Sequence, residues 1–169
     1  MTSAIAKTMT LAAMALLCLM SCRAPAESSD AGGGTLDDAF DRGTLVIVAD
    51  DGKEHVFDVY LATVAEQQRR GLMFVRRMPA TTGMLFIYED SDIHSMWMKN
   101  TYIPLDMVFA RGDGSVSSVI HDTQPLSLTP QASLEPVNYV LELNAGTARR
   151  LNIGNRSHLR LDNGNATAR

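Results

Sequence analysis

The sequence predicts an α+β domain built mainly from antiparallel strands. About seven short runs rich in β-branched and aromatic residues succeed one another between residues 44 and 161. Turn-forming Asp and Gly residues separate neighbouring runs, and only two short stretches have the composition of a helix. We expect the sheet to curl into a small barrel or half-barrel, because closure removes exposed strand edges.

Each expected strand is a short apolar or alternating run bounded by turn residues. Two turns should join neighbouring strands as hairpins, Asp51-Gly52 and Arg111-Gly112-Asp113-Gly114, since Gly readily adopts a positive φ. The strands are expected at residues 44–49, 55–62, 84–88, 105–109, 115–121, 138–144 and 157–161, and residues 94–99 alternate as a further strand would.

Two short helices are expected between these strands. Thr63 and Glu66 have the spacing of a capping box, and Gly71 can end the helix that follows them with a positive φ. The second helix is expected at residues 145–151. Residues 122–136 contain three prolines and no periodicity, which predicts a long surface loop.

Residues 1–22 are typical of an export signal. Their apolar run, from Met9 to Met20, is too short to cross a hydrocarbon core that requires ~20 residues. Leu19-Met20-Ser21-Cys22 is typical of a lipobox, in which Cys22 is lipidated and anchors the protein to a membrane, facing the periplasm. The alternative is cleavage after Ala26, which would give a soluble periplasmic or secreted protein.

The remainder of the chain is predicted to contain a flexible tether at residues 23–42, a folded domain at 43–161 and a disordered tail at 162–169. The two cysteines, Cys18 and Cys22, both precede the domain. A disulfide, a thiolate nucleophile and a cysteine-based zinc site are therefore excluded from it.

The charge balance argues against a nucleic-acid partner. The formal net charge is -4, and the basic residues occur singly or as isolated pairs such as Arg69-Arg70 and Arg76-Arg77. Non-specific binding of nucleic acid requires clustered basic charge. We interpret these pairs as solvated surface residues.

Residues 83–109 contain the chain's one tryptophan and a group of polar residues between two apolar runs. Burial of an unpaired polar group costs several kcal/mol, so these side chains should satisfy one another or line a ligand cleft. Trp97 could form the floor of such a cleft for a sugar, a peptide or a polar metabolite, or it could fill the core. The candidate ligand-binding residues are Trp97, Lys99, Asn100, Thr101, Asp106 and Glu142.

Two alternatives use other chemistry. His94, Met96 and Met98 alternate along one expected strand face, and an imidazole with two thioethers could bind Cu(I), although methionine is also a common core residue. Asp106 and Glu142 could instead act as an acid/base pair in a hydrolase-type enzyme. No G-x-S-x-G motif is present to support a serine hydrolase.

An ordered series of motifs between residues 45 and 161 resembles the DUF192 family, also described as the COG1430 group. The motifs are Gly71-Leu72-Met73, Gly83-Met84-Leu85-Phe86, Trp97-Met98-Lys99-Asn100-Thr101, Pro104-Leu105-Asp106 and Tyr139-Val140-Leu141-Glu142-Leu143 followed by Ala145-Gly146. The resemblance implies a compact β-rich domain of unknown function and no established catalytic residues. Met96 stands where an aromatic residue is more usual in the family.

Together these observations predict an exported cell-envelope protein that binds a small ligand or an envelope component. We expect no cofactor, no catalytic residue, a membrane partner through Cys22, and a monomer.

Overall fold

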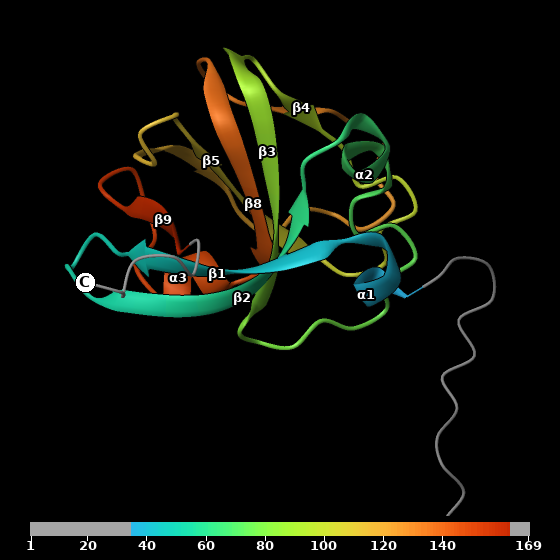
Figure 1. Cartoon of the computed structure of the whole chain (residues 1–169), viewed down its shortest axis with the longest axis horizontal. Helices are drawn as coiled ribbons and strands as arrows, with labels where there is room; N and C mark the ends of the chain where they lie inside the picture. Colours follow the sequence, from blue (N-terminus) through green and yellow to red (C-terminus); the bar gives the residue numbers. More distant parts are fainter. Residues whose placement is uncertain (1–34, 163–169) are drawn as a thin grey trace, which may run out of the picture. The chain divides into compact units, whose positions relative to one another are not determined.

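The computed structural model describes residues 35–162, which form a seven-stranded sheet, a two-stranded ribbon and three short helices (Figure 1). The predicted fold class is confirmed, and the seven strands of the sheet lie where strands were predicted. The export signal, most of the expected tether and the tail from residue 163 onward lie outside the described residues. In the described part, no helix has the length and apolar character needed to cross a membrane.

The elements have the following bounds. The sheet contains β1 (Asp41–Val48), β2 (Glu54–Ala62), β3 (Thr82–Asp92), β5 (Leu105–Ala110), β6 (Val116–Ile120), β8 (Val137–Asn144) and β9 (His158–Asp162). The ribbon pairs β4 (Ser95–Met96) with β7 (Gln131–Ala132). The helices are α1 (Leu36–Ala39), α2 (Ala65–Arg70) and α3 (Thr147–Arg150).

The strand order in the sheet is β6-β5-β8-β3-β2-β1-β9. The predicted hairpins are confirmed, with β1 antiparallel to β2 and β5 antiparallel to β6. However, β2 and β3 are parallel, and α2 lies in the crossover between them. This crossover brings the end of α2 and the residues after it over one face of the sheet.

The sheet curls until its two edge strands meet at one end. Ser115 and His158 form a bridge, the Val116 N–H donates to the Ser157 carbonyl at 2.9 Å, and the Leu159 N–H donates to the Gly114 carbonyl at 2.8 Å. Gly114 has a φ of 90°, and a Cβ there would lie 2.2 Å from the Leu159 carbonyl oxygen. Only glycine fits at this position. The contact between the two edge strands gives the sheet the shape of a half-barrel.

Two hydrophobic cores lie on opposite faces of this sheet. The inner core, enclosed by the curl, receives residues from all seven strands and contains no methionine. Its buried members are Leu45, Ile47, Phe57, Val59, Leu85, Val108, Ala110, Val116, Leu141, Leu143, Ala148, Ile153 and Leu159.

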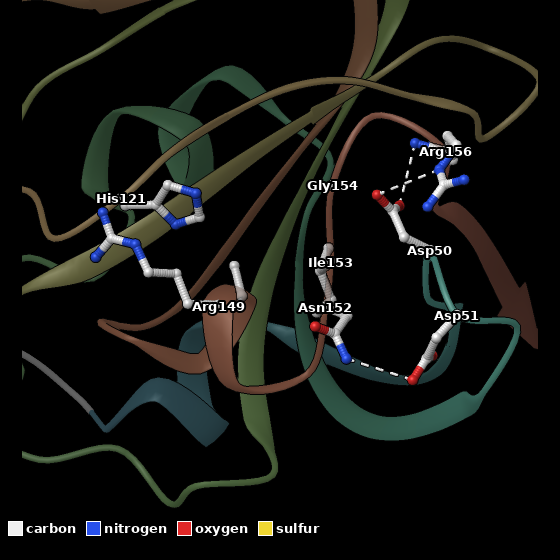
Figure 2. A pocket seen from close by; sticks show the side chains of 9 residues that line it. Asp50, Asp51, His121, Arg149, Asn152, Ile153, Gly154 and Arg156 are labelled. Carbon is white, nitrogen blue, oxygen red and sulfur yellow. Dashed lines mark hydrogen bonds and ion pairs between the residues drawn. The ribbon is translucent and has the colours of Figure 1, made fainter.

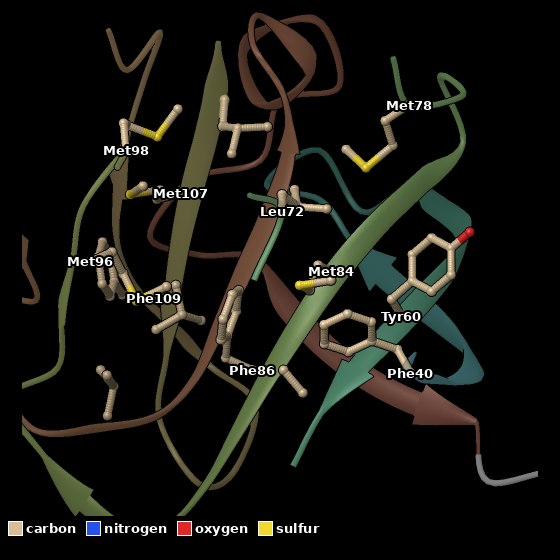
Figure 3. Packing of buried hydrophobic residues seen from close by; sticks show 14 residues of the cluster. Phe40, Tyr60, Leu72, Met78, Met84, Phe86, Met96, Met98, Met107 and Phe109 are labelled. Carbon is tan, nitrogen blue, oxygen red and sulfur yellow. The ribbon is translucent and has the colours of Figure 1, made fainter. Parts of the chain in front are cut away.

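The outer core lies on the other face of the sheet (Figure 3). Five of its members are methionines, so this layer is rich in flexible thioether side chains. Its buried members are Phe40, Tyr60, Ala62, Leu72, Met78, Met84, Phe86, Met96, Met98, Leu105, Met107, Phe109, Val137 and Val140.

Three local predictions need correction. The end of the expected tether is folded, because Phe40 is buried in the outer core and anchors α1 and the start of β1. The capping box is not formed by Thr63 and Glu66. Instead, the Gln67 side chain accepts the backbone N–H groups of Thr63 and Val64 at 3.0 and 3.3 Å.

Residues 95–99 alternate between exposed and buried side chains as expected, but they do not form a continuous strand. Met96 and Met98 are buried, whereas Ser95, Trp97 and Lys99 are exposed. Only Ser95 and Met96 pair with another strand, because the chain turns away at residues 99–100.

Candidate functional site

Four of the six predicted ligand-binding residues line one small pocket. Trp97, Lys99, Thr101 and Glu142 meet there with residues from α2 and the segment after it. We call this cavity the Glu142 pocket. Its remaining lining residues are Gln68, Arg69, Arg70, Gly71, Leu72, Met73, Phe86 and Met96.

Glu142 lies at the base of this pocket, on the outer-core face of β8. It pairs in register with Met84 on β3 and Met107 on β5, so both neighbours are apolar. The residue is only 4% exposed, and its carboxyl group has no hydrogen-bond or ion-pair partner among residues 35–162. Burial raises the pKa of Glu142 to about 8, so the group is mostly protonated at neutral pH.

The rim of the Glu142 pocket is aromatic and basic. Trp97 is 49% exposed, and the Lys99 ammonium group lies 5.1 Å from the centre of its ring system. Arg69 and Arg70 come from the last turn of α2. The cavity has a volume of about 20 Å³, which admits one water-sized group.

Asp106 is not part of this pocket. It lies on the inner-core face of β5, fully buried, where it accepts the backbone N–H groups of Asp122 at 3.0 Å and Ala148 at 2.8 Å. The Nδ1 atom of His121 is 3.9 Å away. Asp106 therefore joins the end of β6 to the start of α3.

The register of β5 and β8 explains why the two acids are separated. Asp106 pairs with Leu143, and Glu142 pairs with Met107, so the acids are offset by one position and point to opposite faces. The hypothesis that all six residues form one site is corrected here, and Asp106 and Glu142 cannot act as an acid/base pair.

Asn100 lies beside the pocket without lining it. Its φ is 56°, and its carbonyl accepts the Phe74 N–H at 2.8 Å. Its side-chain amide is 3.8 Å from the Met73 sulfur. Asn100 therefore shapes the turn that carries Lys99 and Thr101 to the pocket.

Comparison with protein-family models supports the resemblance inferred from the motifs. The model for DUF192, described as uncharacterized ACR, COG1430, matches residues 46–161. The chain belongs to the DUF192 family. A comparison with curated proteins gave no match.

Two solved structures are similar to this DUF192 domain. One, from Sinorhizobium meliloti 1021, was described as a candidate transcription regulator; it is 37% identical, with a TM-score of 0.72, and the match covers 77% of this chain and 98% of that chain. The other, a protein of unknown function from Novosphingobium aromaticivorans DSM 12444, is 30% identical, with a TM-score of 0.67 and coverage of 76% and 99%.

A larger groove of about 490 Å³ lies elsewhere on the DUF192 domain, next to α3 (Figure 2). Its carboxylates already have partners. Asp50 accepts the Ser157 hydroxyl at 2.7 Å and the Arg156 N–H at 3.1 Å, and Asp51 accepts Lys53 at 2.7 Å. Because these carboxylates already have partners within the chain, they are less available to a ligand than Glu142 is.

The methionines of the copper alternative are buried in the outer core, where their sulfur atoms accept hydrogen bonds from different hydroxyl groups. Tyr88 donates to Met96 at 3.7 Å, and Thr123 donates to Met98 at 3.3 Å. His94 stacks on the Tyr88 ring with centroids 3.5 Å apart. These contacts give both methionines a packing role, and the copper site stays a prediction.

A metal site built from harder ligands has no basis in residues 35–162, where no group of three or more His, Cys, Asp or Glu side chains converges.

Sequence reasoning missed the half of the pocket that α2 and the following loop supply. The parallel crossover from β2 to β3 brings four further residues to the pocket: Gln68, Arg69, Arg70 and Met73. The sequence patterns had predicted hairpins and no parallel pair of strands. The available signal was Arg69-Arg70 directly before Gly71-Leu72-Met73, because a basic pair beside a family motif can belong to a site.

Proposed function

We propose that this DUF192 protein is an exported cell-envelope protein that binds a small polar ligand in the Glu142 pocket. One observation carries the proposal: a buried carboxyl group without a partner opens onto a cavity whose rim contains the single tryptophan. Perturbed acids in cavities are frequent at functional sites.

The energetic argument concerns the cost of leaving Glu142 unpaired. A buried polar group without a hydrogen bond destabilises a fold by roughly 1–3 kcal/mol, and an ionised one by more. Leucine or methionine would pack against Met84 and Met107 without this cost. A ligand that hydrogen-bonds to Glu142 would offset the cost in the bound state.

The cavity limits the part of the ligand that can reach Glu142. Its size admits one hydroxyl or amino group, while Trp97 provides an exposed surface on which the rest of the ligand could lie. A sugar, a peptide or a polar metabolite with such a terminal group fits these requirements. Protonated Glu142 would donate to a hydroxyl group, whereas a bound ammonium group would favour the ionised form.

The envelope location is supported by the sequence of residues 1–26. We expect lipidation of Cys22, or cleavage after Ala26 in the soluble alternative. The net charge of -4 does not favour the nucleic-acid role suggested by the name of the Sinorhizobium meliloti relative.

The proposal is tested with a panel of amino sugars, neutral sugars, polyamines and short peptides. Binding is measured from the fluorescence of Trp97, the only tryptophan in the chain. The wild-type protein should bind a member of the panel, Glu142→Leu should weaken binding at least tenfold, and Glu54→Gln, at an exposed carboxylate of β2, should not.

Equal affinities of wild type and Glu142→Leu for every ligand found would contradict the proposed site. The location is tested separately: Cys22→Ser should release the protein from membranes, and unchanged attachment would refute lipidation.

A further inference from the structure

Three segments distant in sequence meet beside the Glu142 pocket. The Phe74 N–H donates to the Asn100 carbonyl at 2.8 Å, and the Leu126 N–H donates to the Thr101 carbonyl at 3.1 Å. A third bond joins the Met98 N–H to the Ser127 carbonyl at 3.0 Å. These bonds connect residues 69–77, 97–102 and 124–128 into one surface region.

This region contains five of the nine large hydrophobic side chains that are exposed in residues 35–162. The Phe74 and Tyr102 rings contact each other edge to face, with centroids 6.3 Å apart. Clusters of exposed apolar residues of this kind mark interaction surfaces. We call the five residues the aromatic face: Phe74, Trp97, Tyr102, Leu126 and Leu128.

The backbone beneath the aromatic face adopts conformations that non-glycine residues rarely use. The φ angles of Phe74, Asn100 and Leu126 are 68°, 56° and 63°. Such conformations cost roughly 1 kcal/mol or more each for residues with a Cβ. The backbone bonds described above hold them, and they leave Phe74 and Leu126 about half exposed.

The segments that form the aromatic face contain basic residues and no acidic ones. Residues 67–88, 93–105 and 123–134 contain no Asp or Glu, although the chain as a whole is acidic. Arg69, Arg76, Arg77 and Lys99 lie in these segments, and none of them forms an ion pair within the described residues.

Several basic residues elsewhere in the described part form ion pairs. Arg42, Arg111 and Arg149 each pair with an acid. On the aromatic face, by contrast, Arg76 lies 4.9 Å from the Tyr102 ring centre and Lys99 lies over Trp97. Arg69, Arg76, Arg77 and Lys99 therefore remain available to an anionic partner.

We propose that the aromatic face docks onto an anionic lipid membrane. Aromatic and leucine side chains lie favourably at the boundary between head groups and acyl chains, and neighbouring Arg and Lys residues bind lipid phosphates. The aromatic face combines such apolar and basic side chains, although the protein as a whole has a net charge of -4 and would be repelled by an anionic membrane. The inference goes beyond the ligand-binding proposal and does not depend on it.

The length of the preceding chain is compatible with this orientation. Cys22, the expected lipidation site, precedes Thr35 by 13 residues. An extended chain spans at most ~3.5 Å per residue, so the domain would stay within roughly 45 Å of an anchored Cys22. The anchor would raise the local concentration of the aromatic face at the bilayer.

The test uses the full chain with vesicles of phosphatidylcholine alone or mixed with phosphatidylglycerol, each containing brominated phosphatidylcholine. Bromine quenches tryptophan at close range, and only Trp97 can report. We expect Trp97 to be quenched in the anionic vesicles and several-fold less in the neutral ones. Because the readout is local to Trp97, attachment through residues 1–22 does not produce it.

Two sets of variants separate the face from other surfaces. Phe74→Asn plus Leu126→Asn keeps residues that tolerate a positive φ and should reduce Trp97 quenching about tenfold, as should Arg76→Glu plus Arg77→Glu. Val56→Asn and Leu134→Asn, at exposed sites outside the face, should leave quenching unchanged.

Absence of quenching in anionic vesicles, or equal quenching in neutral vesicles, would overturn the proposal. A dimer that dissociates in Phe74→Asn plus Leu126→Asn would assign the face to a second copy instead. Glu142→Leu should dock like the wild type, so a failure of the ligand proposal leaves this one standing.

Discussion

Each face of the half-barrel buries one acid, and the two acids lie on neighbouring strands. They differ in whether they have hydrogen-bond partners. Asp106 enters a methionine-free core and accepts two backbone N–H groups. Glu142 enters a methionine-rich core and has no partner in residues 35–162. Burial alone therefore does not identify a functional acid; the hydrogen-bond partners do.

The surroundings of the two acids match this difference. The inner core consists of branched aliphatic side chains, Ala and Phe, and is enclosed by all seven strands. The outer core includes residues of α1 and of loops and contains flexible methionines, which can repack around a bound group. We infer a structural role for the inner acid and a binding role for the outer one.

The largest expected effect is on the structural acid. Asp106→Leu should lower the free energy of unfolding by about 4 kcal/mol, because the buried Ala148 N–H and the part-buried Asp122 N–H would both lose their acceptor. Urea denaturation measures this value. A loss below about 1 kcal/mol would show that the two acids are not as different as the structure indicates.

The next effect concerns pH and Glu142. Its pKa rises from 4.5 in the unfolded chain to about 8 in the fold, so between these values the unfolded state loses a proton that the folded state keeps. Stability should therefore fall as pH rises through this window, by at most about 1.4 kcal/mol per pH unit. Glu142→Gln removes this contribution.

Urea midpoints of wild type and Glu142→Gln at pH 5 and pH 8.5 isolate the contribution, because other groups titrate in both proteins. The variant should gain stability relative to wild type at the higher pH. Parallel pH profiles would mean that Glu142 has a partner in solution.

A smaller effect compares the two cores directly by exchanging leucine and methionine. Leu141→Met in the inner core should cost about 1 kcal/mol, whereas Met107→Leu in the outer core should change stability by about 0.5 kcal/mol or less. Thermal unfolding measures the loss of stability in each variant. Equal losses would mean that the two cores are equally rigid.

The smallest effect is expected at the rim. Lys99→Met should change stability by about 0.5 kcal/mol or less, because an exposed cation–π pair contributes little. The emission of Trp97 should nevertheless shift, since the ammonium group over the indole is removed. An unchanged spectrum would indicate that Lys99 does not occupy this position.

Much of the fold was predictable because it is encoded by neighbours along the chain. The strand between Val137 and Asn144 was recognisable from its apolar run, and the turn at Gly52 from its Asp-Gly pair. Local patterns could not predict the parallel pairing of β2 with β3, since that depends on where the crossover containing α2 packs. The basic half of the pocket was missed for the same reason.

The sequence by itself determined the family, the strands, the cysteine-free domain and the fact that Asp106 and Glu142 lie opposite their apolar neighbours. Only the tertiary structure decided that these two acids lie on different faces. The reason is register: Asp106 pairs with Leu143 rather than Glu142, and a shift of one residue reverses the face to which a side chain points.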